Sequence, residues 1–322
     1  MWSTIRVRGG AVGHDLKLLC IGVVRRRTTA ADEKTGVGVG NEVPDAAGYA
    51  TTIVSEAARG ERFQTPGRLE IAQPRDAVAI VDMLRRTLDP RYHRFSLYRA
   101  ASSARHLEKR LASGDGGGQR VRTVRIDSQL VGFTLSDVLP DRLHLGYIGV
   151  VPESSGKGVG GQLLRELIEA AREHCCVVTL DAFASNTPAI DWYRRHDFSE
   201  VSRSWSMEID LARLPQEPAH GGALNLDEAL AEEMAQGFSS VEINAGLKRL
   251  RIGIIDGTVA RALETDGISE ARVAQIVRGA LPERRTLQFF GRPRPSIELP
   301  VLTVEESVRM RLELARGGTE VR

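Results

Sequence analysis

The residues from Glu153 to Gly161 carry the clearest chemical signal of this 322-residue chain; they read Glu-Ser-Ser-Gly-Lys-Gly-Val-Gly-Gly. Glycine has no side chain, so several backbone N–H groups in such a segment can converge on one anion. Lys157 adds a full positive charge. This composition predicts a phosphate-binding loop, and the alternative is a turn whose glycines only let a helix and a strand pack closely.

The elements on either side of this loop suit the same function. A strand predicted over 142–151 ends at Pro152, which cannot donate to a central ladder. A helix with a clean 3.6-residue period begins at the last glycines, and one stripe of it carries Val159, Leu163, Leu164, Leu167, Ile168 and Ala171. The start of a helix supplies unpaired N–H groups and the positive end of the helix dipole, and both attract phosphate.

The loop differs from the two common nucleotide-binding motifs. The nucleotide P-loop does not fit, because no glycine stands five positions before Gly156 and no Ser or Thr follows Lys157. The dinucleotide pattern G-x-G-x-x-G is met by Gly156, Gly158 and Gly161, and an acidic residue follows at Asp181. Four residues separate the preceding strand from the first glycine, however, and the upstream elements read as a meander of strands. A dinucleotide-binding enzyme therefore stays as an alternative.

A third pattern fits better. The segment from Val150 to Leu164 strongly resembles the acetyl-CoA loop of the GNAT superfamily of N-acetyltransferases, V-x-P-x-x-R/Q-G-x-G-x-G/A, which precedes a leucine-rich helix. The segment from Asn186 to Phe198 resembles the family's downstream pattern N-x-x-A-x-x-x-Y-x-x-x-G-F. The resemblance covers about residues 68–213. It implies an α/β fold with a mixed, largely antiparallel sheet flanked by helices.

The resemblance also implies a reaction and a set of site residues. Acetyl-CoA would be the cosubstrate, and an amine would attack its thioester directly in a ternary complex. Tyr193 stands where the family keeps the tyrosine that protonates the departing thiolate; its alternative role is packing. The cofactor would be bound by Val150, Val151, Ser155, Gly156, Lys157, Gly158, Val159, Gly160, Gly161 and Asn186. Asn186 has starting the following helix as its alternative role, and no metal site is predicted.

Two positions depart from the family pattern. Ser155 stands where the family usually carries Arg or Gln, so the loop lacks a long side chain that closes over the pyrophosphate. Lys157 is expected to compensate electrostatically. Asp197 replaces the usual glycine before Phe198, which touches only a turn, since Asp tolerates the left-handed conformation.

The proton acceptor and the acceptor substrate are not fixed by the sequence. Candidate bases near the predicted strand ends are His144, Tyr147, Asp137 and Asp181, and relay through water is a further alternative. The stretch 88–95, with Arg, His and aromatic residues, lies where the family forms its acceptor wall. Small amines, amino sugars and protein amines all remain open.

The chain is predicted to divide into three parts: a poorly patterned extension at 1–66 with a strand at 18–24, an acetyltransferase domain at 67–213, and a separate small α/β accessory domain at 214–322. In the middle part we expect helices at 77–84 and 100–111, a meander at 121–126, 129–136 and 142–151, then a strand at 176–180, a helix at 187–196 and a hairpin at 198–209. In the last part we expect helices at 226–234, 258–263, 269–281 and 304–315 and strands at 251–255, 287–290 and 297–302.

Residues 259–276 resemble a helix-turn-helix, with a glycine turn and Ser269 capping the second helix. Residues 214–322 hold 14 Lys/Arg and 16 Asp/Glu, however, so the charge excess that binds nucleic-acid phosphates is absent. The charge balance therefore argues against a nucleic-acid partner, and only this last part of the chain leaves that partner open. A CoA-sensing regulatory protein that uses its last part to bind a partner or DNA remains the alternative to an enzyme.

The composition excludes several functional classes of protein. The chain has 44 Lys/Arg against 42 Asp/Glu and only 5% aromatic residues, which argues against a polybasic arm and against base-stacking surfaces. Its three cysteines form neither a disulfide framework nor a zinc spacing. The apolar run at 18–24 is far shorter than the roughly 20 residues that span a bilayer. We therefore expect a cytoplasmic protein without a membrane partner; its oligomeric state is not predicted.

Overall fold

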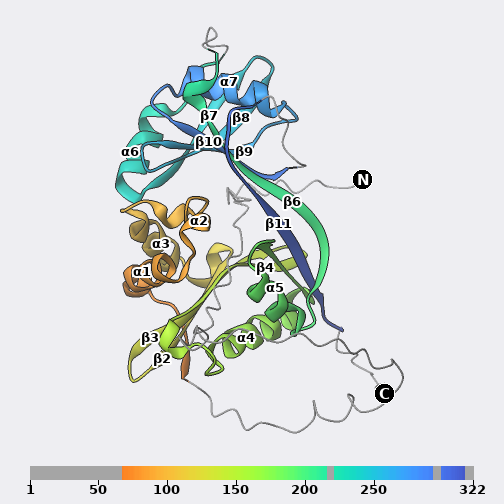
Figure 1. The fold of residues 1–322 in the computed structure, drawn as a ribbon. Coiled ribbons are helices and arrows are strands. Elements are labelled where there is room, and N and C mark those ends of the chain that lie inside the picture. The colour runs from red at the N-terminus through yellow and green to blue at the C-terminus, as the bar shows by residue number, and fades with distance from the viewer. Residues whose placement is uncertain (1–66, 216–220, 293–298, 316–322) are drawn as a thin grey trace, which may run out of the picture.

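The computed structural model describes residues 67–215, 221–292 and 299–315. The strand expected at 18–24 and the rest of the extension at 1–66 lie outside these residues. The strands of the described residues form one mixed sheet, in the order β1-β2-β3-β4-β5-β11-β6-β10-β9-β8-β7 (Figure 1). We call β1 to β5 the first half of this sheet and β7 to β10 the second half. No helix among these residues is long and apolar enough to cross a membrane.

The first half of the sheet is the predicted meander followed by a parallel strand. Its strands are β1 (Arg68–Ile71), β2 (Gln119–Ile126), β3 (Gln129–Leu139), β4 (Arg142–Val150) and β5 (Val177–Phe183). The turn between β2 and β3 consists of Asp127 and Ser128, both with positive φ, as a tight hairpin requires. Strands β1 to β4 pair antiparallel, whereas β5 pairs parallel with β4.

Helices cover both faces of this half (Figure 1). One face carries α1 (Ala77–Thr87), α2 (Pro90–His93) and α3 (Ser103–Ala112), and the other carries α4 (Val159–His174) and α5 (Thr187–Arg194). The apolar stripe predicted for the helix after the glycine loop is buried: Leu163, Leu164 and Leu167 pack with Leu143, Leu145 and Leu180 of the strands. The antiparallel sheet flanked by helices expected from the sequence is thereby confirmed.

The second half repeats the order of the first. A bridge between Ala223 and Ile243 occupies the outer edge, as β1 does in the first half. The elements that follow are α6 (Leu226–Gln236), β7 (Phe238–Ala245), β8 (Lys248–Ile255), β9 (Val259–Glu264), α7 (Glu270–Ala280) and β10 (Thr286–Arg292). Again three strands form an antiparallel meander, a helix follows, and the next strand pairs parallel with the third.

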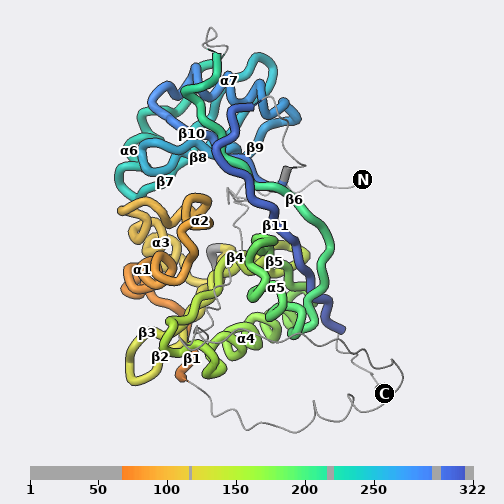
Figure 2. The backbone as a smooth tube through the Cα atoms, viewed as in Figure 1, coloured from red at the N-terminus to blue at the C-terminus, as the bar shows by residue number. Residues whose placement is uncertain are grey.

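The two halves exchange their last strands. The first half continues into β6 (Ser199–Asp210), which pairs with β10 of the second half, and β11 (Val301–Glu313) returns to pair with β5 of the first. These long strands also pair antiparallel with each other and lie side by side across the molecule (Figure 2). The last described strand therefore completes the sheet of the first half, so the sheet is continuous across the predicted division at 213/214.

Three local predictions are wrong. The hairpin expected at 198–209 is the single strand β6, whose antiparallel partner is β11. The helix expected at 304–315 is β11 itself. The first helix of the predicted helix-turn-helix is strand β9, buried between β8 and β10, so this part of the chain has no helix-turn-helix. Helix α7 and its Ser269 cap are as predicted, because Ser269 Oγ accepts from Arg272 N.

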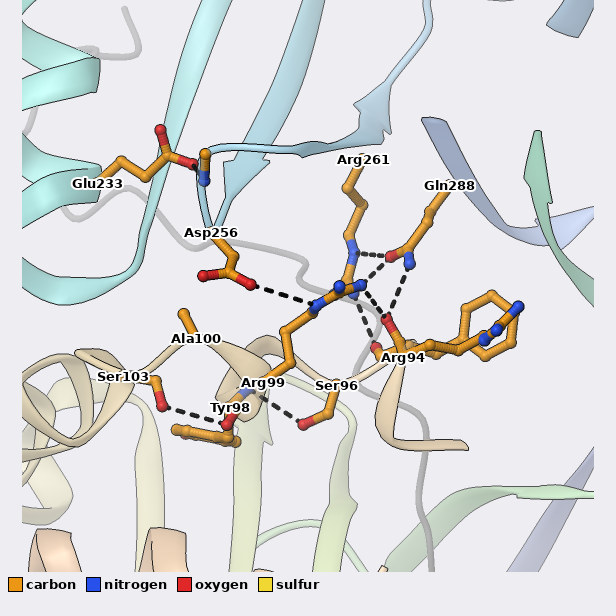
Figure 3. Close-up of polar contacts among 12 residues, drawn as sticks. Arg94, Ser96, Tyr98, Arg99, Ala100, Ser103, Glu233, Asp256, Arg261 and Gln288 are labelled. Atoms are coloured by element: carbon orange, nitrogen blue, oxygen red, sulfur yellow. Dashed lines mark hydrogen bonds and ion pairs between the residues drawn. The ribbon is translucent and has the colours of Figure 1, made fainter. Parts of the chain in front are cut away.

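The halves also meet through a buried polar contact, seen in Figure 3. Arg261 of β9 donates to the main-chain carbonyl of Phe95 at 2.8 Å and to Gln288 Oε1, and Gln288 donates to the carbonyl of Arg94. Burial lowers the pKa of Arg261 to about 10. Phe238, Ile255 and Phe290 pack in the same apolar cluster as α1 and α3, so one of the buried clusters spans both halves.

Candidate functional site

Strands β4 and β5 stay paired over only part of their length. Their pairs are Leu143 with Val178, His144 with Thr179 and Leu145 with Leu180. Directly after the last pair, Gly146 forms a bulge, because Leu145 and Tyr147 face consecutive residues of β3. Strand β4 runs on to Val150 and β5 to Phe183 with no further pair between them, so the two strands diverge toward the glycine loop.

The divergence leaves main-chain donors of β4 aimed away from β3. Val151 donates its N–H to Val131 O at 2.9 Å and so belongs to the sheet. Because N–H groups of an antiparallel strand alternate between its two neighbours, the N–H of Val150 points toward the gap beside β5. Of the two donors predicted from the sequence, Val150 is the one that faces the gap.

Two residues of the glycine loop have left-handed backbone angles. After a 3-10 turn at Pro152–Ser154, Gly156 and Gly158 adopt φ values of +76° and +84°. These left-handed angles favour glycine. Apart from its two chain neighbours, no residue has an atom within 4 Å of the position that a Cβ at Gly156 would take, so that face of the loop is open.

The start of α4 presents a row of N–H groups. Its first intrahelical bond runs from Gln162 N to Gly158 O, so the N–H groups of Val159, Gly160 and Gly161 have no acceptor within the helix. Together with the open loop they form a cradle of main-chain donors. This cradle follows the end of β4 and consists of residues of the loop that the sequence predicts to bind phosphate.

Two basic side chains lie near the cradle. Lys157 is exposed on the loop. Arg165 was not foreseen from the sequence: its Nη1 lies 3.5 Å from where a Cβ of Gly161 would stand. Burial lowers the pKa of His196, and the nearby charges of Arg165 and Arg195 lower it further. Arg165 follows Gly161 by four residues, one helical turn, and that spacing was the available signal.

Helix α5 lies against the same cradle. A Cβ at Gly160 would stand 3.5 Å from the Trp192 ring, in ordinary contact. Tyr193 is fully buried, with its ring centroid 5.0 Å from that of Trp192 and 5.6 Å from that of Phe198. Asn186 is the N-cap residue of α5, and its carbonyl accepts from Ala189 and Ile190, whereas its side chain makes no capping bond. Tyr193 and the cradle therefore lie on the α4 face of the sheet.

The stretch predicted to form the acceptor wall lies on the opposite face. Tyr92 stacks on Phe183 at the end of β5, with ring centroids 4.1 Å apart, and its hydroxyl is 2.5 Å from Ser185 Oγ. The predicted wall thus packs against the strand that borders the gap.

The four candidate bases are all placed by the structure. Tyr147 Oη is 3.1 Å from Ser96 Oγ, and Asp137 accepts from Gln119 Nε2 at 3.0 Å. His144 and Asp181 lie together, with Nε2 and Oδ2 3.9 Å apart. Within the described residues, no cluster of His, Cys, Asp and Glu side chains has the makings of a metal site.

Comparison with known proteins identifies the class. The model of the acetyltransferase (GNAT) family matches residues 81–198, so the chain contains a domain of this family and is an acyltransferase enzyme. A search of curated protein sequences gives no match.

Solved structures are similar to this chain at low sequence identity, and one of the three described here has a TM-score above 0.5. A presumed acetyltransferase from Pyrococcus horikoshii is 14% identical, with a TM-score of 0.51, and the likeness covers 78% of this chain and 90% of that one. A GCN5-related N-acetyltransferase from Kribbella flavida is 15% identical, with coverages of 76% and 70% and a TM-score of 0.43. The PaiA N-acetyltransferase from Thermoplasma acidophilum, solved with coenzyme A, is 16% identical, with coverages of 42% and 90% and a TM-score of 0.37.

Proposed function

We propose that the protein transfers the acetyl group of acetyl-CoA to an amine by direct attack in a ternary complex. The observation that carries this proposal is the divergence of β4 and β5 directly beneath a cradle of main-chain donors. A pyrophosphate would bind the N–H groups from Gly156 to Gly161, with Lys157 and Arg165 balancing its charge. The pantetheine arm would then lie in the gap.

The residues of the gap supply the chemistry of the transfer. The Val150 N–H would bind the pantetheine arm or the thioester carbonyl, and a donor aimed at a developing oxyanion is worth several kcal/mol. Tyr193 on the α4 face would donate its hydroxyl proton to the departing thiolate. The amine would enter from the opposite face, past the wall formed by α2. A small-molecule amine and a protein amine both remain candidate acceptors, and Asn186 is proposed to contact the CoA arm.

The deciding experiment measures free thiol released from acetyl-CoA by the full chain with a panel of small amines, amino sugars and lysine peptides. We expect release that depends on one class of amine and a rise in Tm with acetyl-CoA alone. A larger Tm rise with NAD would favour a dinucleotide-binding enzyme. A Tm rise with acetyl-CoA but no thiol release with any amine would favour a CoA-sensing protein.

A further prediction concerns Ser155. Replacing Ser155 with Arg is expected to tighten acetyl-CoA binding about tenfold, because a guanidinium can bond two phosphate oxygens at once. Ser155 is half-buried, and its main-chain N–H already bonds to Pro152 O. Isothermal titration checks the change, with Ser155→Gln as the uncharged control. Weaker binding in both variants would mean that the loop depends on the small hydroxyl.

A further inference from the structure

A buried polar cluster lies where β4 and β5 begin to diverge, on the face opposite α4. His144 of β4 precedes the last paired residue of its strand, and Asp181 of β5 follows the last paired residue of its own. Leu143, Leu145 and Leu180 pack toward α4, so the alternation of side chains directs His144 and Asp181 to the other face. That is the face on which α2 packs and from which we expect the amine to enter.

The third member of this cluster comes from the far end of the chain. Arg309 of β11 stands opposite Asp181 in the antiparallel register. Its Nε and Nη2 donate to the two carboxylate oxygens of Asp181 at 2.8 and 2.6 Å. This two-point contact raises the pKa of Arg309 and fixes the position of a carboxylate that is only 10% exposed.

The imidazole is held between Asp181 and a hydroxyl. His144 Nδ1 lies 3.0 Å from Thr179 Oγ1, while Nε2 lies 3.9 Å from Asp181 Oδ2. In the tautomer that carries its proton on Nδ1, the ring donates to Thr179 Oγ1 and Nε2, on the side of Asp181, is the basic nitrogen. Once Nε2 is protonated, the neighbouring carboxylate balances the new charge.

We propose that His144 takes the proton of the attacking amine and that Arg309, contributed by the exchanged strand β11, is the positioning residue that holds Asp181 against it. This inference rests on the proposed transfer reaction. As the amine nitrogen bonds to the thioester carbonyl carbon, the C–S bond breaks and its electron pair leaves with the CoA sulfur. The proton lost by nitrogen passes to His144 Nε2, and Tyr193 protonates the thiolate on the other face.

The same face of the second half holds a different arrangement. There Arg261 and Gln288 bind the main-chain carbonyls of residues 94 and 95 (Figure 3), and Gln288 also donates to Glu208 Oε2 at 2.7 Å. These side chains connect the two halves of the protein. Among the described residues, His144 and the ion pair between Asp181 and Arg309 therefore lie in the first half, where β4 and β5 begin to diverge, on the face opposite the glycine cradle.

Other charged groups on this face also influence the protonation of His144. Asp137 is the cross-strand neighbour of His144, bonded to Gln119 and 3.6 Å from Arg110 of α3. Arg311 stands opposite Thr179 on β11, but it is half exposed and pairs with Glu313. Arg311 therefore offers a matched control: the same residue type on the same strand and face, without contact to Asp181.

The test compares Arg309→Met, Asp181→Asn and the control Arg311→Met in the full chain. Without Arg309, the unbalanced carboxylate should stabilise protonated His144, so the acid limb of the pH–rate profile moves up by about one unit. Without Asp181, the guanidinium should disfavour the protonated ring, so the limb moves down by a similar amount. Arg311→Met should leave the limb in place, and Arg309→Lys should restore most of the normal profile.

An NMR titration of the His144 ring protons, assigned with His144→Gln, measures the same displacements without any substrate. Opposite displacements in Arg309→Met and Asp181→Asn support the cluster even if no amine is acetylated, in which case only the proposed function fails. Displacements in the same direction, or an equal displacement in Arg311→Met, would overturn the role of Arg309. Normal transfer rates and an unchanged acid limb in folded His144→Gln would overturn the role of the imidazole.

Discussion

Replacing Tyr193 with Phe is expected to slow the chemical step about 100- to 10,000-fold, the usual contribution of a positioned general acid. The ring is fully buried between Trp192 and Phe198, and Phe keeps these contacts. The fold and the affinity for acetyl-CoA should therefore change little. Single-turnover acetyl transfer is the measurement required, since slow product release would hide the loss in steady-state rates.

Tyr98→Phe is the matched control for this variant. Tyr98 is as deeply buried as Tyr193 but packs in the other cluster, against Tyr147. It therefore loses a buried hydroxyl without touching the proposed thiolate site. Equal single-turnover rates in wild type, Tyr193→Phe and Tyr98→Phe would assign Tyr193 to packing alone and leave the main-chain donors as the catalytic groups.

Replacing Gly160 with Glu is expected to weaken acetyl-CoA binding at least about 100-fold. The atoms nearest to a Cβ at this position belong to Trp192 and Val150 and lie at ordinary contact distances, so a side chain can start there without a backbone clash. A carboxylate in the first turn also suits the helix dipole, and the apo protein should melt at or above the normal temperature. Its charge would stand beside the pyrophosphate, where two like charges 4 Å apart repel by roughly 4 kcal/mol at an effective dielectric constant of 20.

Gly160→Gln separates charge from size, because it has the same shape without the charge. Isothermal titration should show a modest loss for Gln and a large loss for Glu, and the Tm rise with acetyl-CoA should vanish only for Glu. Trp192 beside Gly160 gives a second readout through its fluorescence on cofactor binding. Unchanged affinity in a folded Gly160→Glu protein would place the pyrophosphate elsewhere.

The parts of the fold that follow from local pattern were predictable. The meander, the glycine loop and α4 each have a periodicity that their neighbours reinforce, and all three are as expected. Strand β11 was not, because Val304, Val308 and Leu312 recur every four residues, a spacing that fits both a helix face and one face of a strand. Val259 to Glu264 is rich in helix-forming residues, yet its place between β8 and β10 overrides that preference.

The candidate site likewise has residues that the sequence reveals and residues that only the fold reveals. The cradle residues are contiguous in the chain, so their spacing alone revealed them. Arg309 lies 128 residues from Asp181 and reaches it only because the sheet places β11 beside β5. No local pattern marks Arg309 as different from Arg311 two positions later. A contact made by the topology of the sheet can be found only once the strand order is known.

The strand exchange has a consequence for how the chain acquires its structure. On the ribosome, β5 emerges long before β11, so its partner edge stays open during synthesis of everything between them. Pairings between such distant segments pay a large loop-closure entropy and slow folding. An unpaired edge of this kind also recruits other chains. We therefore expect the first half to aggregate when it is expressed alone. We expect the whole chain to unfold in a single transition in which both halves lose their structure together.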